Sequence, residues 1–549
     1  MKQVQMLPII IAGLCERFNI SFGIGGNRAY TNWSHIQLPA LPMDDAEVRK
    51  LALGYTIHEI GHILFTDKGV WDEWVASAGG LEKGVVNILE DVRMEAKLPT
   101  RYPGSKSSLK DLADKLVLDG EFEPTQESMP PQVLMSAFML YRLRADVLGH
   151  NLDELGKMAQ DHLEKAIPKG AMTRLQAMMY EIEEAESVAD SINLARKIIK
   201  MLEDEQEKEE QQQQQQQEQQ QQDQSSCQGS DDGDQPQSAS GEGDSQESSG
   251  QGAGQADEDG NGSGAKALAD ILASDGDGMM DLDKTLEAML EQSSDSMPAG
   301  TSVDMPQTYR YDFKATVPMN STGVKQQTAE LRRRLTELLR AQARSKRKFV
   351  TEGHRLARNR LARIAVGDPA VFERRKKGFV PDASVMLLID RSGSMTTEIG
   401  LAIEAAAAAG LALEKVNGVK SAISAFPYGN SVGLLKDFGE SVNKAMDVFP
   451  LVTANGSTPL AEAMLWSGWK LMSQKTQRKV LFVLTDGDPN NRVSATLMTD
   501  MLQKHGIEIM GIGINHTINL FKEQRRIDNI KDLPSAVFEM LEDAMLLVA

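Results

Sequence analysis

Residues 383–395 read ASVMLLIDRSGSM, an unbroken apolar run that ends at Asp390 and opens into a short polar loop. Three similar apolar runs follow, separated by stretches with helical spacing: SAISAF (421–426), KVLFVLT (479–485) and IEIMGIGI (507–514). Continuous apolar strands that alternate with helices are typical of a parallel sheet covered on both faces. The sequence therefore predicts a doubly wound α/β domain over 381–549.

Polar residues follow the ends of these strands, which is where ligands bind in such sheets. The DRSGS loop offers one carboxylate and two hydroxyls at alternate positions, the run LFVLTD ends in a second carboxylate, and the loop NGSTPL carries a threonine. Thr453 and Ser457 compete with that threonine for its role. Oxygen ligands from three loops suit a hard cation such as Mg2+. The predicted magnesium ligands are Asp390, Ser392, Ser394, Thr458 and Asp486.

This arrangement of DxSxS, loop threonine and strand-terminal aspartate resembles the metal-ion-dependent adhesion site (MIDAS) of von Willebrand factor A (VWA) domains. The stretch from about Leu331 through RLARIAVGDPAVFERR to LLIDRSGSM also resembles the C-terminal half of the cobaltochelatase CobT subunit. The resemblance implies that the cation captures an acidic side chain of another protein, and that the partner is an AAA+ ATPase ring, CobS-like or MoxR-like. The sequence contains no GxxxxGK[ST] loop, so we expect that partner to hydrolyse ATP.

A second motif, YTIHEIGHILFTD, lies near the N-terminus and matches the HExxH pattern of zincins. On a helix, His58 and His62 lie one turn apart on the same face and can bind one Zn2+. Glu59 lies beside them, where it can deprotonate a zinc-bound water, so it is the candidate catalytic residue. The motif departs from what the CobT resemblance implies, although the run VRMEA echoes a VRxEA run of that family.

The third zinc ligand must come from elsewhere, and the next helical run, VVNILEDVRMEAKL, carries three acidic residues. We expect Glu90 to be the ligand and Asp91 to support it or replace it, because both share one helix face with Asn87 and Met94. Upstream, NISFGIGGNRAYTNWSHIQLP reads as a strand, a turn and a second strand, the kind of edge along which a zincin lays its substrate. This order predicts a mainly helical, zincin-like α+β domain over 1–204.

The composition changes sharply between the two predicted domains. Residues 205–264 are acidic and rich in Gln, Ser and Gly, so they cannot bury enough apolar surface to fold, and we expect a disordered linker. Residues 265–380 read as short helices followed by a basic arm, with 17 Lys/Arg against 5 Asp/Glu between 325 and 377. Leu331, Leu335, Leu338 and Leu339 predict a basic amphipathic helix in this arm. We favour docking to a protein over nucleic acid, because aromatic stacking residues are nearly absent.

Global features suggest a cytoplasmic protein with no membrane span. Its two cysteines, Cys15 and Cys227, are far apart, the formal charge is −20, and no run of about 18 apolar residues occurs. Three functions fit the motifs: an adaptor that engages an ATPase and a protein substrate, a cobaltochelatase subunit that inserts Co2+ into a corrin precursor, and a zinc metallopeptidase. A catalytic HExxH site is required by the metallopeptidase but not by the adaptor or the cobaltochelatase subunit.

Overall fold

The computed structural model divides the chain into two compact units. The helical unit comprises Asp45–Gln292, and the sheet unit combines Met1–Asp44 with Ser293–Ala549. Apart from scattered single positions, the structure describes residues 20–42, 45–226, 260–276, 278–294, 302–319, 346–367, 369–376, 382–515 and 517–528. Most of the predicted basic helix around Leu331–Leu339 lies outside these ranges.

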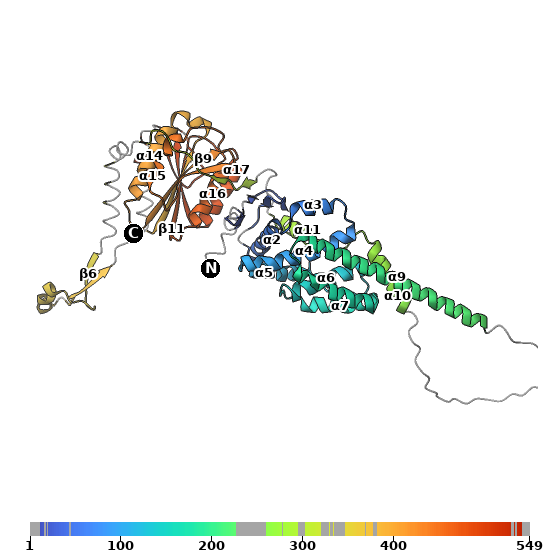
Figure 1. Ribbon diagram of the computed structural model, residues 1–549. Helices are drawn as coiled ribbons and strands as arrows, with labels where there is room; N and C mark the ends of the chain where they lie inside the picture. The colour runs from blue at the N-terminus through green and yellow to red at the C-terminus, as the bar shows by residue number, and fades with distance from the viewer. Residues whose placement is uncertain are drawn as a thin grey trace, which may run out of the picture. The chain divides into compact units, whose positions relative to one another are not determined.

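Helices form nearly all of the helical unit (Figure 1). Helix α2 packs against α4, α5 and α11, while α9 packs against α4, α8 and α10. The elements are α2 (Ala46–Phe65), α3 (Lys68–Val75), α4 (Gly80–Arg101), α5 (Ser105–Leu118), α6 (Pro131–Asp146), α7 (Asp153–Ala166), α8 (Lys169–Met179), η2 (Tyr180–Glu184), α9 (Val188–Ser226), α10 (Gly260–Ala273) and α11 (Leu282–Gln292).

Helix α2 approaches its neighbours closely because it carries two glycines on its packing surface. A Cβ at Gly61 would lie 2.4 Å from the Met94 sulfur in α4, and one at Gly54 would lie 2.7 Å from the Leu112 Cβ in α5. The helix starts at Asp45, whose side chain accepts a hydrogen bond from the Glu47 N–H at 2.8 Å. Close packing of α2 on α4 brings the HEIGH sequence against the acidic run of the second helix.

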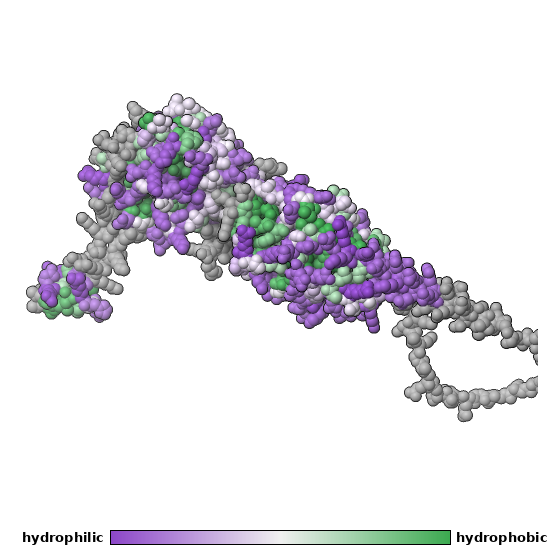
Figure 2. Space-filling model, viewed as in Figure 1, coloured by the Kyte–Doolittle hydropathy of each residue, from purple (hydrophilic) through white to green (hydrophobic). Residues whose placement is uncertain are grey.

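The polar segment after the helical core differs from the prediction. Helix α9 continues through the glutamine tract to Ser226, and α10 begins at Gly260, so the predicted linker over 205–264 is wrong at both ends. Gln and Glu are good helix formers, and the apolar start of α9 is anchored by packing, so the helix propagates outward. Where Figure 2 colours it, the part of α9 that extends beyond the packed helices is hydrophilic. Residues 227–259 lie outside the described part of the chain.

The boundaries of the predicted domains also change. Helices α10 and α11, assigned to a separate segment over 265–380, pack on α9 and α2 and complete the helical unit. Their apolar residues Leu268 and Leu286 are fully buried in this unit. The strands β1 (Ser21–Ile24), β2 (Tyr30–Thr31) and β3 (His35–Leu38) belong to the sheet unit instead, so 1–204 is not a single domain.

These N-terminal strands form a small four-stranded sheet with a distant strand, β4 (Val303–Asp304). Strands β1 and β3 pair in parallel, while β2 with β3 and β1 with β4 pair antiparallel. The expected substrate-binding edge therefore does not belong to the unit that carries the HExxH helix. In the basic arm, β6 (Lys346–Val350) and β7 (Phe372–Lys376) form an antiparallel ribbon around η3 (Arg358–Val366).

The main sheet of the sheet unit has seven strands in the order β13-β12-β11-β8-β9-β10-β5. The predicted doubly wound α/β domain is confirmed, but β10 runs antiparallel to β9 and the short β5 extends the edge. The strands are β5 (Gln307–Tyr309), β8 (Ala383–Asp390), β9 (Val419–Tyr428), β10 (Ser431–Lys436), β11 (Arg478–Thr485), β12 (Ile507–Ile514) and β13 (Glu523–Ile527).

Helices cover both faces of this sheet, α14 and α15 on one side and α16 and α17 on the other (Figure 1). All eight residues of β8 are buried, which explains the unbroken apolar run before Asp390. The elements between strands are η4 (Gly393–Thr397), α14 (Ile399–Leu413), α15 (Val442–Ala445), η5 (Phe449–Leu451), α16 (Leu460–Met472) and α17 (Arg492–Lys504). Across the described residues, no helix is both long and apolar enough to cross a membrane.

Candidate metal centres

The first candidate centre lies at the carboxyl ends of the neighbouring strands β8 and β11. The Ser394 hydroxyl donates to Asp486 Oδ1 at 2.7 Å, and the Ser392 and Ser394 hydroxyl oxygens lie 3.0 Å apart. The Ser392 N–H donates to Asp390 Oδ1 at 2.7 Å, which sets the turn of the DRSGS loop. Four of the five predicted magnesium ligands thus form one connected oxygen cluster.

Asp390, one of the two carboxylates of this centre, is fully buried. The Thr485 hydroxyl donates to its Oδ2 at 2.5 Å. Burial raises the pKa of Asp390, although the hydrogen bonds from Thr485 and Ser392 oppose that rise, and the charge of Asp486 adds to it. A divalent cation bound here would balance two carboxylates that hydroxyls and amides solvate only in part.

Thr458 approaches this cluster on a third loop. Gly393 N–H donates to the Gly456 carbonyl at 2.9 Å and so joins the two loops. The Thr458 N–H donates to Asn490 Oδ1 at 2.8 Å, and the Asn490 N–H donates back to the Thr458 carbonyl at 2.9 Å. These two hydrogen bonds hold the Thr458 backbone beside the loop that follows β11, and Thr458 is buried at 8% exposure.

Arg391, inside the DRSGS motif, holds the first loop in position. It is buried, donates to the carbonyls of Thr453 and Pro427, and stacks over the Tyr428 ring at 4.2 Å. In the DxSxS pattern Arg391 is only the residue between two predicted ligands. The pattern could not show that Arg391 holds the loop in position, because its partners lie on β9 and on the loop before α16.

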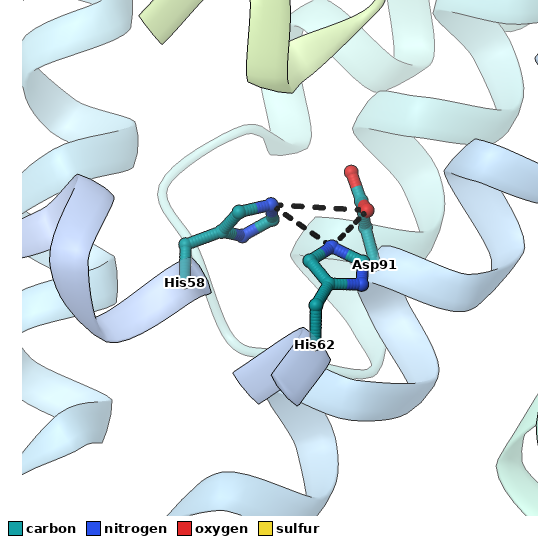
Figure 3. A group of neighbouring side chains, drawn as sticks. All are labelled: His58, His62 and Asp91. Atoms are coloured by element: carbon teal, nitrogen blue, oxygen red, sulfur yellow. Dashed lines mark hydrogen bonds and ion pairs between the residues drawn. The ribbon is translucent and has the colours of Figure 1, made fainter. Parts of the chain in front are cut away.

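The second candidate centre lies in the helical unit, where His58, His62 and Asp91 converge from α2 and α4 (Figure 3). The Nε2 atoms of the two histidines lie 3.3 Å apart, and Asp91 Oδ1 lies 3.2 Å from His62 Nε2 and 3.8 Å from His58 Nε2. All three potential ligand atoms lie within 4.8 Å of one another. Two imidazoles and one carboxylate are a donor set that fits Zn2+.

A layer of charges surrounds this group. Glu95 Oε1 lies 2.8 Å from His58 Nδ1, and Arg144 reaches both oxygens of Glu95 at 3.1 and 2.9 Å. Burial alone would raise the pKa of Glu95, but the Arg144 charge and the His58 contact lower it to about 2. An ionised carboxylate on Nδ1 orients the ring and leaves Nε2 for a metal.

The histidines themselves favour a positive charge between them. Burial alone would lower the pKa of His58, but the charge of Asp91 and hydrogen bonds to Asp283 and Glu95 raise it well above its ordinary value. Burial likewise opposes the raised pKa of His62, which the contact with Asp91 and the charge of Asp283 produce. A bound cation would supply the positive charge that the surrounding carboxylates attract, and the histidines could then remain neutral.

Glu90, the expected third zinc ligand, is not part of this group. Its oxygens accept from Thr66 Oγ1 at 2.5 Å, Arg93 Nε at 2.7 Å and Ser191 Oγ at 2.8 Å. One residue along an α-helix turns a side chain by about 100°, so Glu90 and Asp91 face different neighbours. The expectation that Glu90 is the third ligand is therefore wrong for this group. Asp91, which we gave as the alternative, lies with the histidines instead.

Glu59, the candidate general base, is buried at 5% exposure and lies between the two histidines in α2. Asp283 of α11, which the sequence argument did not consider, also reaches this group, and its Oδ1 lies 2.9 Å from His58 Nε2.

Residues 62–271 are similar to a protein family described as "Cobalamin biosynthesis protein CobT". The matched range lies in the helical unit and includes His62 and Asp91, and it covers less than half of the chain. The resemblance suggested by the C-terminal sequence therefore also extends to the N-terminal helices. Over these residues the chain is similar to that family.

Solved structures similar to this chain include a von Willebrand factor type A protein from Catenulispora acidiphila, at 20% identity and a TM-score of 0.27 over 32% of this chain and 44% of that one. Proximal thread matrix protein 1 from the mussel byssus, with a zinc-occupied MIDAS motif, has 16% identity and a TM-score of 0.26 over 30% and 46%. Manganese-loaded Plasmodium vivax TRAP protein has 16% identity and a TM-score of 0.24 over 29% and 72%. The chain thus spans less than half the length of the first two proteins.

Proposed function

We propose that this chain is a CobT-like adaptor in an ATP-driven two-protein machine, whose sheet unit engages an AAA+ ATPase ring through a Mg2+ ion. The observation that carries the proposal is the oxygen cluster of Asp390, Ser392, Ser394 and Asp486 at the ends of β8 and β11. Its two serine hydroxyls and two carboxylates are hard ligands, and Thr458 would complete five oxygens. A carboxylate from the partner would take the remaining position.

The absence of a nucleotide-binding loop from the sequence supports a division of labour. In this proposal the ATPase, CobS-like or MoxR-like, supplies the energy, and this chain carries the substrate. The similarity of residues 62–271 to the CobT family favours such a partnership over extracellular adhesion.

The test is copurification of the full chain with a CobS-like ATPase in the presence of Mg2+. We expect Asp390→Ala to abolish the interaction and chelation of Mg2+ to release the wild-type complex. Asp488→Ala is the matched control, because it removes a carboxylate from the same loop after β11, where Asp488 forms an ion pair with the exposed Arg492. Binding that persists in excess chelator would exclude a cation bridge.

We further propose that the helical unit binds one Zn2+ through His58, His62 and Asp91. Metal analysis of the full chain should then find about one zinc, and His62→Ala should lose it. His162→Ala is the control, because His162 contacts Thr125 at 2.8 Å on another part of the unit. Equal zinc content in the two variants would contradict this site.

Two enzymatic functions remain as candidates for the helical unit. The CobT similarity favours participation in Co2+ insertion into a corrin precursor, which an assay with the ATPase partner, Co2+ and corrin substrate would measure. The position of Glu59 between His58 and His62 in the HExxH sequence favours peptide hydrolysis by a zinc-bound water. Glu59→Gln would abolish hydrolysis and leave the zinc content unchanged, whereas cleavage that survives this substitution would eliminate the peptidase.

A further inference from the structure

The sheet unit contains a cavity of about 450 Å3 that none of the predicted magnesium ligands lines. Its walls come from four parts of this unit: the N-terminal strands, the segment from β4 to β5, the turn between β9 and β10, and the first turn of α16. Ligand pockets usually have volumes of about 300–1,000 Å3. The cavity is therefore large enough to hold a long side chain of another protein.

The lining of this cavity carries negative charge. Asp304 of β4 and Glu462 of α16 line it together with His35, and the lining includes no Lys or Arg. Burial and the charge of Asp304 raise the pKa of Glu462. Among the described residues, no Lys or Arg forms an ion pair with either carboxylate. A positively charged ligand would balance these two groups, which otherwise repel each other.

Both carboxylates are carried by elements with a fixed position. Asp304 pairs with Gly23 across β4 and β1, and a Cβ at Gly23 would lie 2.8 Å from Asp304 Oδ1. Glu462 lies in the first turn of α16, where Leu460 and Met464 are buried. A ligand that binds between them therefore meets carboxylates that need little reordering.

The rest of the lining suits a cation with an apolar stem. Met305, Phe426 and Val432 are apolar, and Gln307 and Asn430 offer amide oxygens that accept hydrogen bonds. An arginine side chain combines an aliphatic stem with several N–H donors in a planar fork that matches carboxylates, whereas lysine is a compact point charge. Arginine is therefore the protein cation that this lining fits best.

The cavity lies at the same edge of the main sheet as the oxygen cluster. Phe426 pairs with Asp390 across β9 and β8, and its carbonyl accepts a hydrogen bond from the Arg391 N–H at 2.6 Å. Pro459, which also lines the cavity, directly follows Thr458 in the chain. A protein bound at the oxygen cluster would therefore lie next to the cavity.

We propose that this cavity binds an arginine side chain of a partner protein, with Asp304 and Glu462 as the carboxylates that receive the guanidinium group. The stem of the arginine lies along Phe426 and Val432, and the charge complementarity of the lining selects the partner. This contact goes beyond the proposed Mg2+ bridge and does not need it, because the predicted magnesium ligands do not line the cavity.

The experiment titrates the full chain with the peptide acetyl-Gly-Arg-Gly-amide, without Mg2+ or an ATPase, and follows binding by saturation-transfer difference NMR. Asp304→Asn and Glu462→Gln should each weaken binding about tenfold or more, because each removes a charged acceptor of the guanidinium group. Asp304 is exposed, so its variant keeps the test valid even if Glu462→Gln disturbs α16. The matching citrulline peptide, which has a similar shape but no charge, should also bind about tenfold or more weakly.

Glu404→Gln is the matched control, because Glu404 is a half-buried carboxylate of α14, which covers the other face of the main sheet. This variant should bind the arginine peptide as the wild type does. Failure of the arginine peptide to bind, equal binding of the citrulline peptide, or equal affinity in wild type, Asp304→Asn and Glu462→Gln overturns the proposal. A chain that binds the arginine peptide but shows no Mg2+-dependent ATPase contact overturns the cation bridge alone.

Discussion

The two candidate centres both contain buried carboxylates, but different kinds of neighbouring groups stabilise the negative charge in each. In the sheet unit, Asp390 is surrounded by neutral donors, the hydroxyl of Thr485 and the amide of Ser392, on loops at strand ends. In the helical unit, Asp91 and Glu95 are surrounded by charged groups, Arg144 and two histidines with raised pKa values, on packed helices. The oxygen cluster of the sheet unit lies on loops, whereas the three potential ligands of the helical unit, His58, His62 and Asp91, come from two packed helices.

This difference predicts how much stability each centre loses when one of its side chains is replaced. A site built on neutral donors loses a hydrogen bond when one donor is removed, but no charge is left unpaired. A site built on buried opposite charges leaves an unpaired ion when one partner is removed, which costs far more. The effects of substitutions should therefore be larger in the helical unit.

The largest effect is expected from Arg144→Met, which leaves Glu95 and Asp91 without their guanidinium partner. Removing one member of a buried ion pair costs about 3–5 kcal/mol, so the helical unit should unfold at a clearly lower urea concentration. Circular dichroism of the full chain follows this transition. Arg142→Met removes a partly exposed i,i+4 contact with Asp146 and should cost below about 1 kcal/mol. Similar losses in both variants would contradict the contrast between the centres.

The next effect is an acid sensitivity that comes from His150, which is buried at 5% exposure next to this charge layer. Burial lowers its pKa from 6.5 to about 4, and the Arg144 charge contributes. A histidine with a depressed folded pKa contributes stability above the unfolded value, and this stability is lost as the pH falls from about 6.5 to about 4. The shift corresponds to about 3 kcal/mol at most.

His150→Gln should remove that part of the pH dependence from urea unfolding measured between pH 7 and pH 4. His162→Gln serves as the control, because it removes a histidine whose Nδ1 contacts Thr125 away from the charge layer. An unchanged slope in the His150 variant would assign the acid sensitivity of the helical unit to its carboxylates instead.

In the sheet unit, Thr485→Val should have an intermediate effect, because it deletes the hydroxyl that donates to the buried Asp390. A hydrogen bond to a charged group contributes about 1.5–3 kcal/mol. Mg2+ should offset part of the loss, and a thermal scan with and without Mg2+ measures it. Thr499→Val deletes a hydroxyl that bonds the Ala495 carbonyl inside α17, and it should cost about 1 kcal/mol without any Mg2+ dependence.

The smallest effect is expected at the surface of the sheet unit, where Arg310 pairs with Asp437 at 3.1 Å and Glu440 at 2.9 Å. Its side chain is 47% exposed, so water and salt screen these contacts. Arg310→Ala should change the free energy of unfolding by below about 1 kcal/mol, and less in 0.5 M salt. A loss as large as that of Arg144→Met would mean that charge pairing matters equally in both units.

Sequence reasoning succeeded where function depends on residues close together in the chain. The alternation in DRSGS and the one-turn spacing in HEIGH each specify side chains that converge on one strand end or one helix face. It failed where helix phase or distant packing decides. Choosing Asp91 over Glu90 required knowledge of the rotation of α4 about its axis. That rotation depends on the packing of α4 against α2, where Met94 lies against Gly61.

The amino-acid sequence by itself determined the doubly wound domain, the helix that carries His58 and His62, and the oxygen cluster at the ends of β8 and β11. These follow from local periodicity and from the rule that polar residues end buried strands. Only the tertiary structure decided that Asp91 joins the histidines, that β1–β3 belong to the sheet unit, and that Asp283 contacts His58. Such choices depend on which apolar surfaces cover one another across hundreds of residues, and no local pattern encodes that.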